Sequence, residues 1–236
     1  MPVSLKDQVV LVVGASSGMG RETALLFAAE GAHVMASARR ADRLAELEPN
    51  GISVHPADAT DAAAMQELAD ETLRRFGRID ILVFATGTNI PDRAMSRLTT
   101  ELWDMMIGVN LNGAYYATRA VLPAMRQQKA GSIYYISSKS AVIPDESGAS
   151  YQAAKRGLAG LSQAIRVEEK DNGIRTCVVC PGLTDTEIIL KRPVKTPAET
   201  LAKALQAIDV AELVVSLAKL PARAWVPEVQ IFPAEL

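Results

Sequence analysis

Short apolar runs alternate with helical patterns along this chain, and this alternation constrains its fold more than any other feature. The runs are rich in Val, Ile and Leu, which is typical of strands buried on both faces of a parallel sheet. Intervening helices supply the crossovers that parallel pairing requires, so we expect a doubly wound α/β fold. The predicted strands are 9–13, 33–37, 52–55, 79–85, 132–137, 174–180 and 229–232, and the predicted helices are 20–30, 43–48, 62–76, 101–127, 151–171 and 210–220.

Glycines and capping residues mark the predicted helix ends. Gly31 and Gly173 stand just past helical patterns, where glycine accepts a left-handed backbone. Asp61 and Thr100 precede helical patterns and are predicted N-caps. No linker or repeat interrupts the 236 residues, so we expect residues 1–236 to form a single domain.

Charge and hydropathy exclude several classes of protein. The net charge of -2 gives no basic face for nucleic acid. Residues 1–8 lack a targeting pattern, and the longest apolar run, 9–13, is far shorter than the ~20 residues of a membrane span. We therefore expect a cytoplasmic protein with neither a nucleic-acid nor a membrane partner.

Two cysteines, Cys177 and Cys180, form a C-x-x-C pair. They fall in a predicted strand, where residues three apart point to opposite faces. No second Cys or His pair completes a metal site. We expect two free core thiols and no metal.

A glycine-rich turn follows the first predicted strand and opens the first helix. Free backbone N–H groups and the helix dipole favour an anion there, and glycines let the backbone approach a ligand. The spacing G-x-x-x-G-x-G therefore indicates a phosphate site, although a turn that only packs helix on strand would look similar. The predicted ligand-contacting residues are Gly14, Ser16, Ser17, Gly18, Met19 and Gly20.

The same loop matches G-x-S-x-G, the nucleophile elbow of α/β hydrolases, with Ser16 as its serine. A hydrolase triad needs a histidine well downstream of the serine. The chain has only His33 and His55, both in predicted strand regions. A Ser16 hydrolase thus remains an alternative without a base.

Two arginines, Arg39 and Arg40, follow the second predicted strand, and Ala38 stands where an acidic residue would bind a ribose 2′-hydroxyl. A guanidinium at this point accommodates a 2′-phosphate. The pattern favours NADP(H) over NAD(H). Arg39 is the predicted phosphate ligand, and Arg40 is interpreted as a solvated charge.

Catalytic chemistry is indicated by Tyr151 and Lys155, which share a helix face at i and i+4. A neighbouring ammonium lowers the pKa of a phenol and makes it a usable acid and base. Ser138 follows a predicted strand, at the sheet edge where α/β folds bind ligands. Asn110 and Asn112 precede Gly113 inside a predicted helix, which suggests a local distortion.

Together, the glycine loop, Asn110, Ser138, Tyr151 and Lys155 resemble the short-chain dehydrogenase/reductase family over the whole chain. The resemblance implies a Rossmann-type seven-stranded parallel sheet in one dinucleotide-binding and catalytic domain. It also implies a nicotinamide cofactor and a homotetramer or homodimer.

The resemblance assigns roles to these residues. Tyr151 would donate a proton to a carbonyl, Lys155 would lower its pKa and bind the nicotinamide ribose, and Ser138 would hold the substrate oxygen. Asn110 would anchor a water that relays protons through Lys155. Further implied cofactor contacts are Asp58, Ala59, Gly87, Pro181, Gly182, Thr184 and Thr186.

Two motifs depart from the family's pattern. Val13 replaces the usual Thr of the loop, and Phe84-Ala-Thr-Gly87 replaces Asn-Asn-Ala-Gly. Replacing both partners of a hydrogen bond with apolar groups can leave the stability nearly unchanged. We expect a repacked cofactor site that still functions, and a non-catalytic dinucleotide sensor is the alternative.

The expected reaction is hydride transfer between NADP(H) and a small carbonyl or alcohol. In the family, a turn that resembles residues 180–186 cradles the nicotinamide. Basic residues follow this turn and Ser138, and they are compatible with a keto or hydroxy acid, although a solvated loop would look alike. These residues are Lys139, Lys191, Arg192 and Lys195. The segment 225–233 resembles family members that act on small hydroxy acids and alcohols.

Extra apolar residues on two long helices fit either subunit pairing or packing on the sheet. They are Met105, Tyr115, Tyr116, Leu158 and Leu161.

Overall fold

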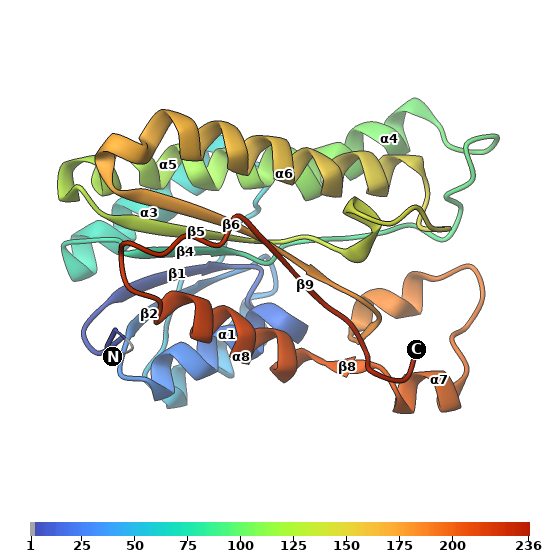
Figure 1. Ribbon diagram of the computed structural model, residues 1–236, viewed down its shortest axis with the longest axis horizontal. Helices are drawn as coiled ribbons and strands as arrows, with labels where there is room; N and C mark the ends of the chain where they lie inside the picture. Colours follow the sequence, from blue (N-terminus) through green and yellow to red (C-terminus); the bar gives the residue numbers. More distant parts are fainter. Residues whose placement is uncertain (1–2) are drawn as a thin grey trace.

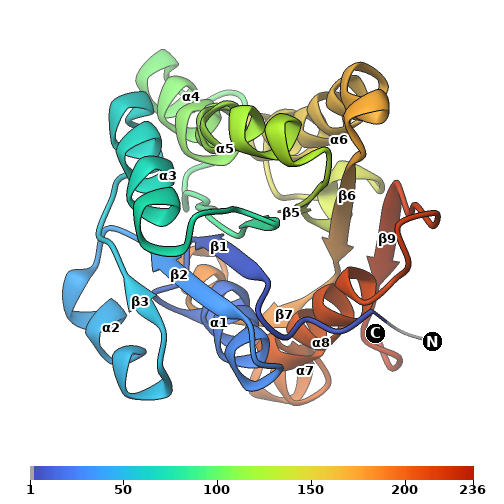
Figure 2. The ribbon, with the colours of Figure 1, turned by 90° about the vertical axis from the view of Figure 1, so that its left-hand side faces the viewer.

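A computed structural model describes residues 3–236 and shows a seven-stranded, all-parallel sheet between two layers of helices (Figures 1 and 2). Residues 1 and 2 lie outside the described residues. They belong to the segment 1–8, for which we expect no targeting pattern. The strand order is β3-β2-β1-β4-β5-β6-β9, which confirms the Rossmann-type doubly wound fold. Its strands are β1 (Val9–Val13), β2 (His33–Ser37), β3 (Ser53–Val54), β4 (Ile81–Phe84), β5 (Gly131–Ile136), β6 (Ile174–Pro181) and β9 (Glu228–Ile231). A separate small sheet pairs β7 (Thr184–Asp185) with β8 (Leu205–Gln206).

Eight α-helices occur in the described residues, and they divide between the two faces of the sheet. They are α1 (Gly18–Ala29), α2 (Ala41–Ala45), α3 (Ala62–Phe76), α4 (Thr100–Ile107), α5 (Gly113–Gln128), α6 (Ala149–Glu169), α7 (Ala198–Ala202) and α8 (Ala207–Ala218). Helices α3, α4, α5 and α6 cover one face, and α1 and α8 cover the other (Figure 2). Short 3-10 helices occupy Glu48–Asn50, Lys139–Ala141, Lys170–Asn172 and Glu187–Lys191.

The core explains why the strand β1 is apolar at every position. Val10 and Val12 pack into the cluster beneath α1 and α8, which includes Phe27. Leu11 and Val13 pack into the opposite cluster, beneath α3, α5 and α6. Successive strand residues point to opposite faces, so a strand covered on both sides has no polar position.

Helix ends follow the predicted capping with one correction. Asp61 caps α3, and its side chain accepts hydrogen bonds from the backbone N–H groups of Ala63 and Ala64. Thr99, not Thr100, caps α4, because its hydroxyl accepts the backbone N–H of Leu102 at 3.3 Å.

The predicted helix 101–127 is interrupted by a π-helical turn, Gly108–Asn112, between α4 and α5. This turn confirms the distortion expected from Asn110, Asn112 and Gly113. π-Turns inside helices frequently occur at functional sites. Here the turn buries Asn110 completely.

Two further predictions concern buried and exposed side chains. Cys177 and Cys180 are free and buried in opposite core clusters, as predicted. Leu158 is also a core residue and adds no surface to α6, whereas Met105 and Tyr115 are exposed. Within residues 3–236, no helix has the length and apolarity to cross a membrane.

Candidate active site

A cleft of about 420 Å³ opens at the carboxyl ends of the strands β1, β4, β5 and β6. Ser138, Tyr151 and Lys155 line it, together with every residue expected to contact the cofactor. Those residues are Gly14, Ser16, Ser17, Gly18, Met19, Gly20, Arg39, Asp58, Ala59, Gly87, Pro181, Gly182, Thr184 and Thr186. The fold thus brings together residues that are dispersed over most of the sequence.

The glycine loop needs its glycines for both conformation and space. Gly14 has a φ of +100°, and a Cβ there would lie 2.6 Å from the backbone nitrogen of Thr86. Helix α1 then begins without a side-chain cap on its first N–H groups. Uncapped N–H groups at a helix N-terminus favour an anion such as a phosphate.

Arg40 lies at the glycine loop, which corrects its interpretation as a solvated charge. Its guanidinium donates to the hydroxyls of Ser16 (2.9 Å) and Ser17 (2.6 Å). It also forms an ion pair with Glu187 at 2.8 Å. Arg39 is 71% exposed and lies 3.8 Å from Asp58. Both arginines line the cleft, but Arg40 is the more firmly placed.

The turn after β6 closes the cleft on another side. Thr184 donates its hydroxyl to the Gly182 carbonyl at 3.2 Å. The Thr186 hydroxyl is buried and has no hydrogen-bonding partner in the described protein. A buried hydroxyl without a partner is costly unless a ligand satisfies it. With the glycine loop and Arg40, this hydroxyl fits a dinucleotide with several phosphate and amide groups.

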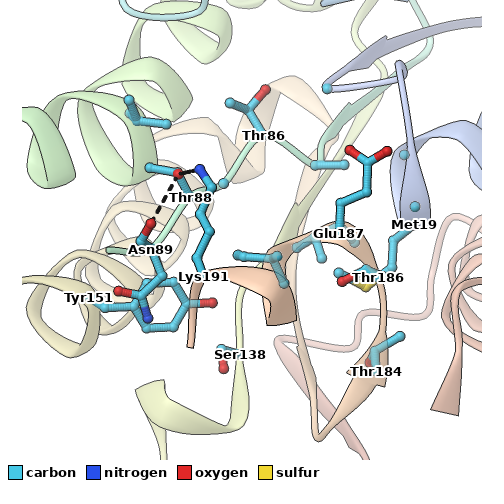
Figure 3. A pocket seen from close by; sticks show the side chains of 18 of the residues that line it. Met19, Thr86, Thr88, Asn89, Ser138, Tyr151, Thr184, Thr186, Glu187 and Lys191 are labelled. Atoms are coloured by element: carbon cyan, nitrogen blue, oxygen red, sulfur yellow. Dashed lines mark hydrogen bonds between the residues drawn. The ribbon is translucent and has the colours of Figure 1, made fainter. Parts of the chain in front are cut away.

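Figure 3 shows the cleft from close by, with Tyr151 and Ser138 on one side and Met19, Thr186 and Glu187 on the other. Tyr151 comes from the first turn of α6 and Ser138 from the end of β5. The ammonium of Lys155 is 5.8 Å from the ring centroid of Tyr151. Lys155 donates to the Ile136 carbonyl at 2.9 Å, which fixes its ammonium beneath the site.

The protonation of Tyr151 differs from the sequence-based expectation. Burial raises the pKa of Tyr151 to about 12, and a hydrogen bond with Ser138 opposes this increase. Burial also lowers the pKa of Lys155 to about 8. In the protein alone, desolvation therefore dominates the pKa of Tyr151, and the expected lowering by the Lys155 ammonium is not seen.

Asn110 lies behind the cleft wall and does not line it. Its side chain accepts the backbone N–H of Thr88 at 3.0 Å, and it donates to the carbonyls of Thr88 and Met106. Through these bonds, the Asn110 amide holds the loop after β4 in place. A Cβ on Gly87 would come within 3.3 Å of both Asn110 and Lys155, so this loop passes between them.

The departures Val13 and Phe84 are accommodated by apolar packing. Both side chains are buried in the same cluster, and Phe84 lies against Gly113 of α5. The backbone N–H of Ala85 still donates to the Val13 carbonyl at 2.8 Å. The site is repacked, as expected, without an unsatisfied side chain at either position.

The hydrolase alternative has no support in the described residues. Arg40 occupies the Ser16 hydroxyl through two hydrogen bonds. No histidine lines the cleft, and His33 instead stacks on Phe76. Residues 3–236 also contain no cluster of His, Cys, Asp or Glu that could hold a metal.

The substrate end of the cleft includes residues that sequence reasoning missed. Lys139, Lys191 and Arg192 line the cleft as expected, whereas Lys195 does not. Arg93 and Asp145 also line it. Both lie in irregular segments without a motif, so only the fold reveals their position.

Comparisons with known proteins agree with this site. Residues 8–195 match the family described as short chain dehydrogenase. The 3-oxoacyl-acyl-carrier-protein reductase of Thermotoga maritima is 34% identical over 84% of this chain and 83% of its own.

Two solved structures extend the similarity to the fold. A closed form of serine dehydrogenase complexed with NADP+ has a TM-score of 0.88 and 30% identity, covering 95% of this chain and 94% of that chain. An alcohol dehydrogenase from the archaeon Thermococcus sibiricus, complexed with 5-hydroxy-NADP, has a TM-score of 0.86 and 27% identity, covering 98% of each chain.

A doubly wound sheet with a glycine loop after its first strand and a Ser/Tyr/Lys group at its strand ends defines a dinucleotide-dependent oxidoreductase. Within that class, the chain belongs to the short-chain dehydrogenase/reductase family.

Proposed function

We propose that this protein is an NADP(H)-dependent enzyme that interconverts a small carbonyl compound and its alcohol. The convergence of Ser138, Tyr151 and Lys155 at one end of the dinucleotide cleft carries the proposal. The cofactor, when bound, supplies or accepts the hydride. The protein's own residues hold the substrate oxygen and move the proton.

Ser138 and Tyr151 would both hydrogen-bond the substrate oxygen. Because its pKa is raised to about 12, Tyr151 keeps its proton at neutral pH and can donate it to the oxygen of a carbonyl as that oxygen becomes an alcohol. Lys155, fixed by the Ile136 carbonyl, lies close enough to stabilise the phenolate that remains.

Preference for NADP(H) is supported by the arginines after β2. Arg40, Ser16 and Ser17 form a group of donors at the glycine loop, and Arg39 lines the same cleft. Ala38 offers no carboxylate to a ribose hydroxyl. Two similar structures contain NADP+ or 5-hydroxy-NADP, which favours the same choice. A cytoplasmic homodimer or homotetramer remains part of the proposal.

The test is Tyr151→Phe, with Tyr115→Phe on the exposed side of α5 as the matched control. We expect kcat to fall by about 10²–10⁴-fold, because the proton donor is lost. NADPH affinity and the control's kinetics should not change. A non-catalytic sensor would show no turnover in the wild type either, and an unchanged kcat in Tyr151→Phe would remove Tyr151 from the reaction.

A further inference from the structure

Unpaired positive charge gathers around the catalytic end of the cleft. Arg93, Lys139, Lys191 and Arg192 line the cleft near Tyr151, and none of them forms an ion pair within residues 3–236. The acidic residue there, Asp145, already accepts hydrogen bonds from the Ser140 hydroxyl (2.8 Å) and the Ser147 backbone (2.9 Å). The local excess of cations therefore favours an anionic ligand.

Arg93 is held in place by neutral groups. Its Nε donates to the Ile90 carbonyl at 3.0 Å, and one terminal nitrogen donates to the Lys191 carbonyl at 2.8 Å. Its stem packs on Gly148, where a Cβ would lie 2.7 Å from the Cβ of Arg93. Gly148 directly precedes α6, whose first turn carries Tyr151. Arg93 is thus placed against the same turn as the catalytic phenol.

The remaining nitrogen, Nη1, has no hydrogen-bonding partner among the described residues. Partial burial and the neighbouring Arg192 lower the pKa of Arg93, and Tyr151 and Asp145 oppose this decrease. The guanidinium remains charged at neutral pH, and the nearby Asp145 forms no ion pair with it, so Arg93 lacks a paired counter-charge within the described residues. A bound anion would supply it.

Lys191 adds a second cation to the lining of the cleft. Its ammonium donates to the Thr88 hydroxyl at 2.5 Å. Figure 3 shows this bond, with Asn89 beyond Thr88. Two basic residues from distant parts of the chain therefore meet at the substrate end.

We propose that Arg93, assisted by Lys191, binds a carboxylate of the substrate, so that the enzyme acts on hydroxy acids and oxo acids. This inference rests on the proposed carbonyl–alcohol chemistry and specifies its substrate class. A guanidinium binds a carboxylate with charge-assisted hydrogen bonds, which Arg93 can extend from its free nitrogen.

Binding rather than turnover gives the sharpest test. Glycolate, 3-hydroxypropanoate and 4-hydroxybutanoate would be titrated calorimetrically into the NADP+-saturated protein, each beside its uncharged primary amide. At least one acid should bind about tenfold or more tightly than its amide, because a charge-assisted bond is lost in the amide. Added NaCl should weaken the binding of the acid and leave the binding of the amide unchanged.

Two substitutions locate the effect. Arg93→Gln should remove the preference for the acid, and Arg93→Lys should retain part of it. Arg97→Gln is the matched control, since Arg97 lies on the same segment, pairs with Asp92 and does not line the cleft. NADPH affinity, measured on every variant, shows whether the fold survives. Lys191→Gln should weaken the binding of the acid by a smaller factor than Arg93→Gln does.

Several outcomes would overturn the proposal: equal binding of acid and amide, no binding of either, no salt dependence, or an acid preference that persists in Arg93→Gln. Failure of the proposed function is separate. If acids bind in an Arg93-dependent way but the wild type oxidises none of them, the carboxylate site stands and the dehydrogenase activity does not.

Discussion

Burial of Tyr151 and Lys155 has opposite effects on their charges. Lys155 is only 3% exposed, and its pKa is lowered to about 8, so its ammonium destabilises the folded protein below that pH. Tyr151 is kept protonated over the physiological range. The site therefore tolerates an unfavourable charge to place an ammonium beside the phenol.

Lys155→Met should raise the free energy of unfolding at pH 7, by on the order of 1–3 kcal/mol, while abolishing activity. Between pH 8 and the lysine's ordinary pKa of 10.5, Lys155 binds more protons in the unfolded chain than in the folded one, so its contribution to wild-type stability rises with pH. The buried thiols Cys177 and Cys180, whose pKa values are raised, act in the opposite direction in wild type and variant alike. The variant should lack only the rise that Lys155 contributes. Urea unfolding of wild type and variant at pH 7 and pH 9.5 measures both effects, because the ionisation of phenols and thiols is common to the two proteins and cancels in their difference. A change in stability between these pH values that is equal in wild type and variant would show that Lys155 is not responsible.

Among individual residues, Tyr151, Lys155, Ser138 and the glycines could be predicted, because their spacing is set within single elements. Arg93 could not. Its partner Lys191 is 98 positions away, and only the folded chain brings them together. Arg40 was misread for the same reason, since its partner Glu187 is 147 positions away.

At the scale of elements, the 3-10 helix Glu187–Lys191 reaches from the turn after β6 to the start of α2. Glu187 pairs there with Arg40, and it also lies 4.0 Å from Arg43. The hydrogen bond from Arg40 lowers the pKa of Glu187, so the carboxylate is ionised at neutral pH. If Arg40 binds a 2′-phosphate, as the proposed preference for NADP(H) requires, Glu187 competes for the same guanidinium.

Glu187→Gln should tighten NADPH binding by up to about fivefold and leave NADH binding unchanged, because an exposed ion pair contributes at most about 1 kcal/mol. Fluorescence titration of each cofactor measures the effect. Glu46→Gln, which removes an exposed carboxylate near Arg21 and outside the cleft, is the control. Weaker NADPH binding in Glu187→Gln would instead make this carboxylate part of the cofactor site.

Elements with strong local signals were predicted well. The helix α3 begins and ends as predicted, since Asp61 caps it and Gly77 ends it with a φ of +77°. The short elements α7 and β8 were missed, because five and two residues carry no measurable periodicity. They lie in the region after the nicotinamide turn, where tertiary contacts determine the backbone.

For the whole molecule, the class of fold followed from the apolar runs, because a strand covered on both faces has no polar position. Strand order did not follow from any local pattern. For example, β1 pairs with β4 and places Val10 opposite Ile81, although β2 and β3 lie between these strands in the sequence. The resemblance to a family predicted seven parallel strands, which the sheet confirms, and the folded structure adds their order.

The central claim is that this cleft binds NADP(H) for hydride transfer, and separate titrations of NADPH and NADH into the purified wild type test it most directly. We expect NADPH to bind about tenfold or more tightly, through charge-assisted bonds from Arg40 to the 2′-phosphate. Arg40→Gln should remove most of that difference, and Arg39→Gln less of it. Tighter binding of NADH would contradict the cofactor assignment, and binding of neither cofactor would contradict the enzyme itself.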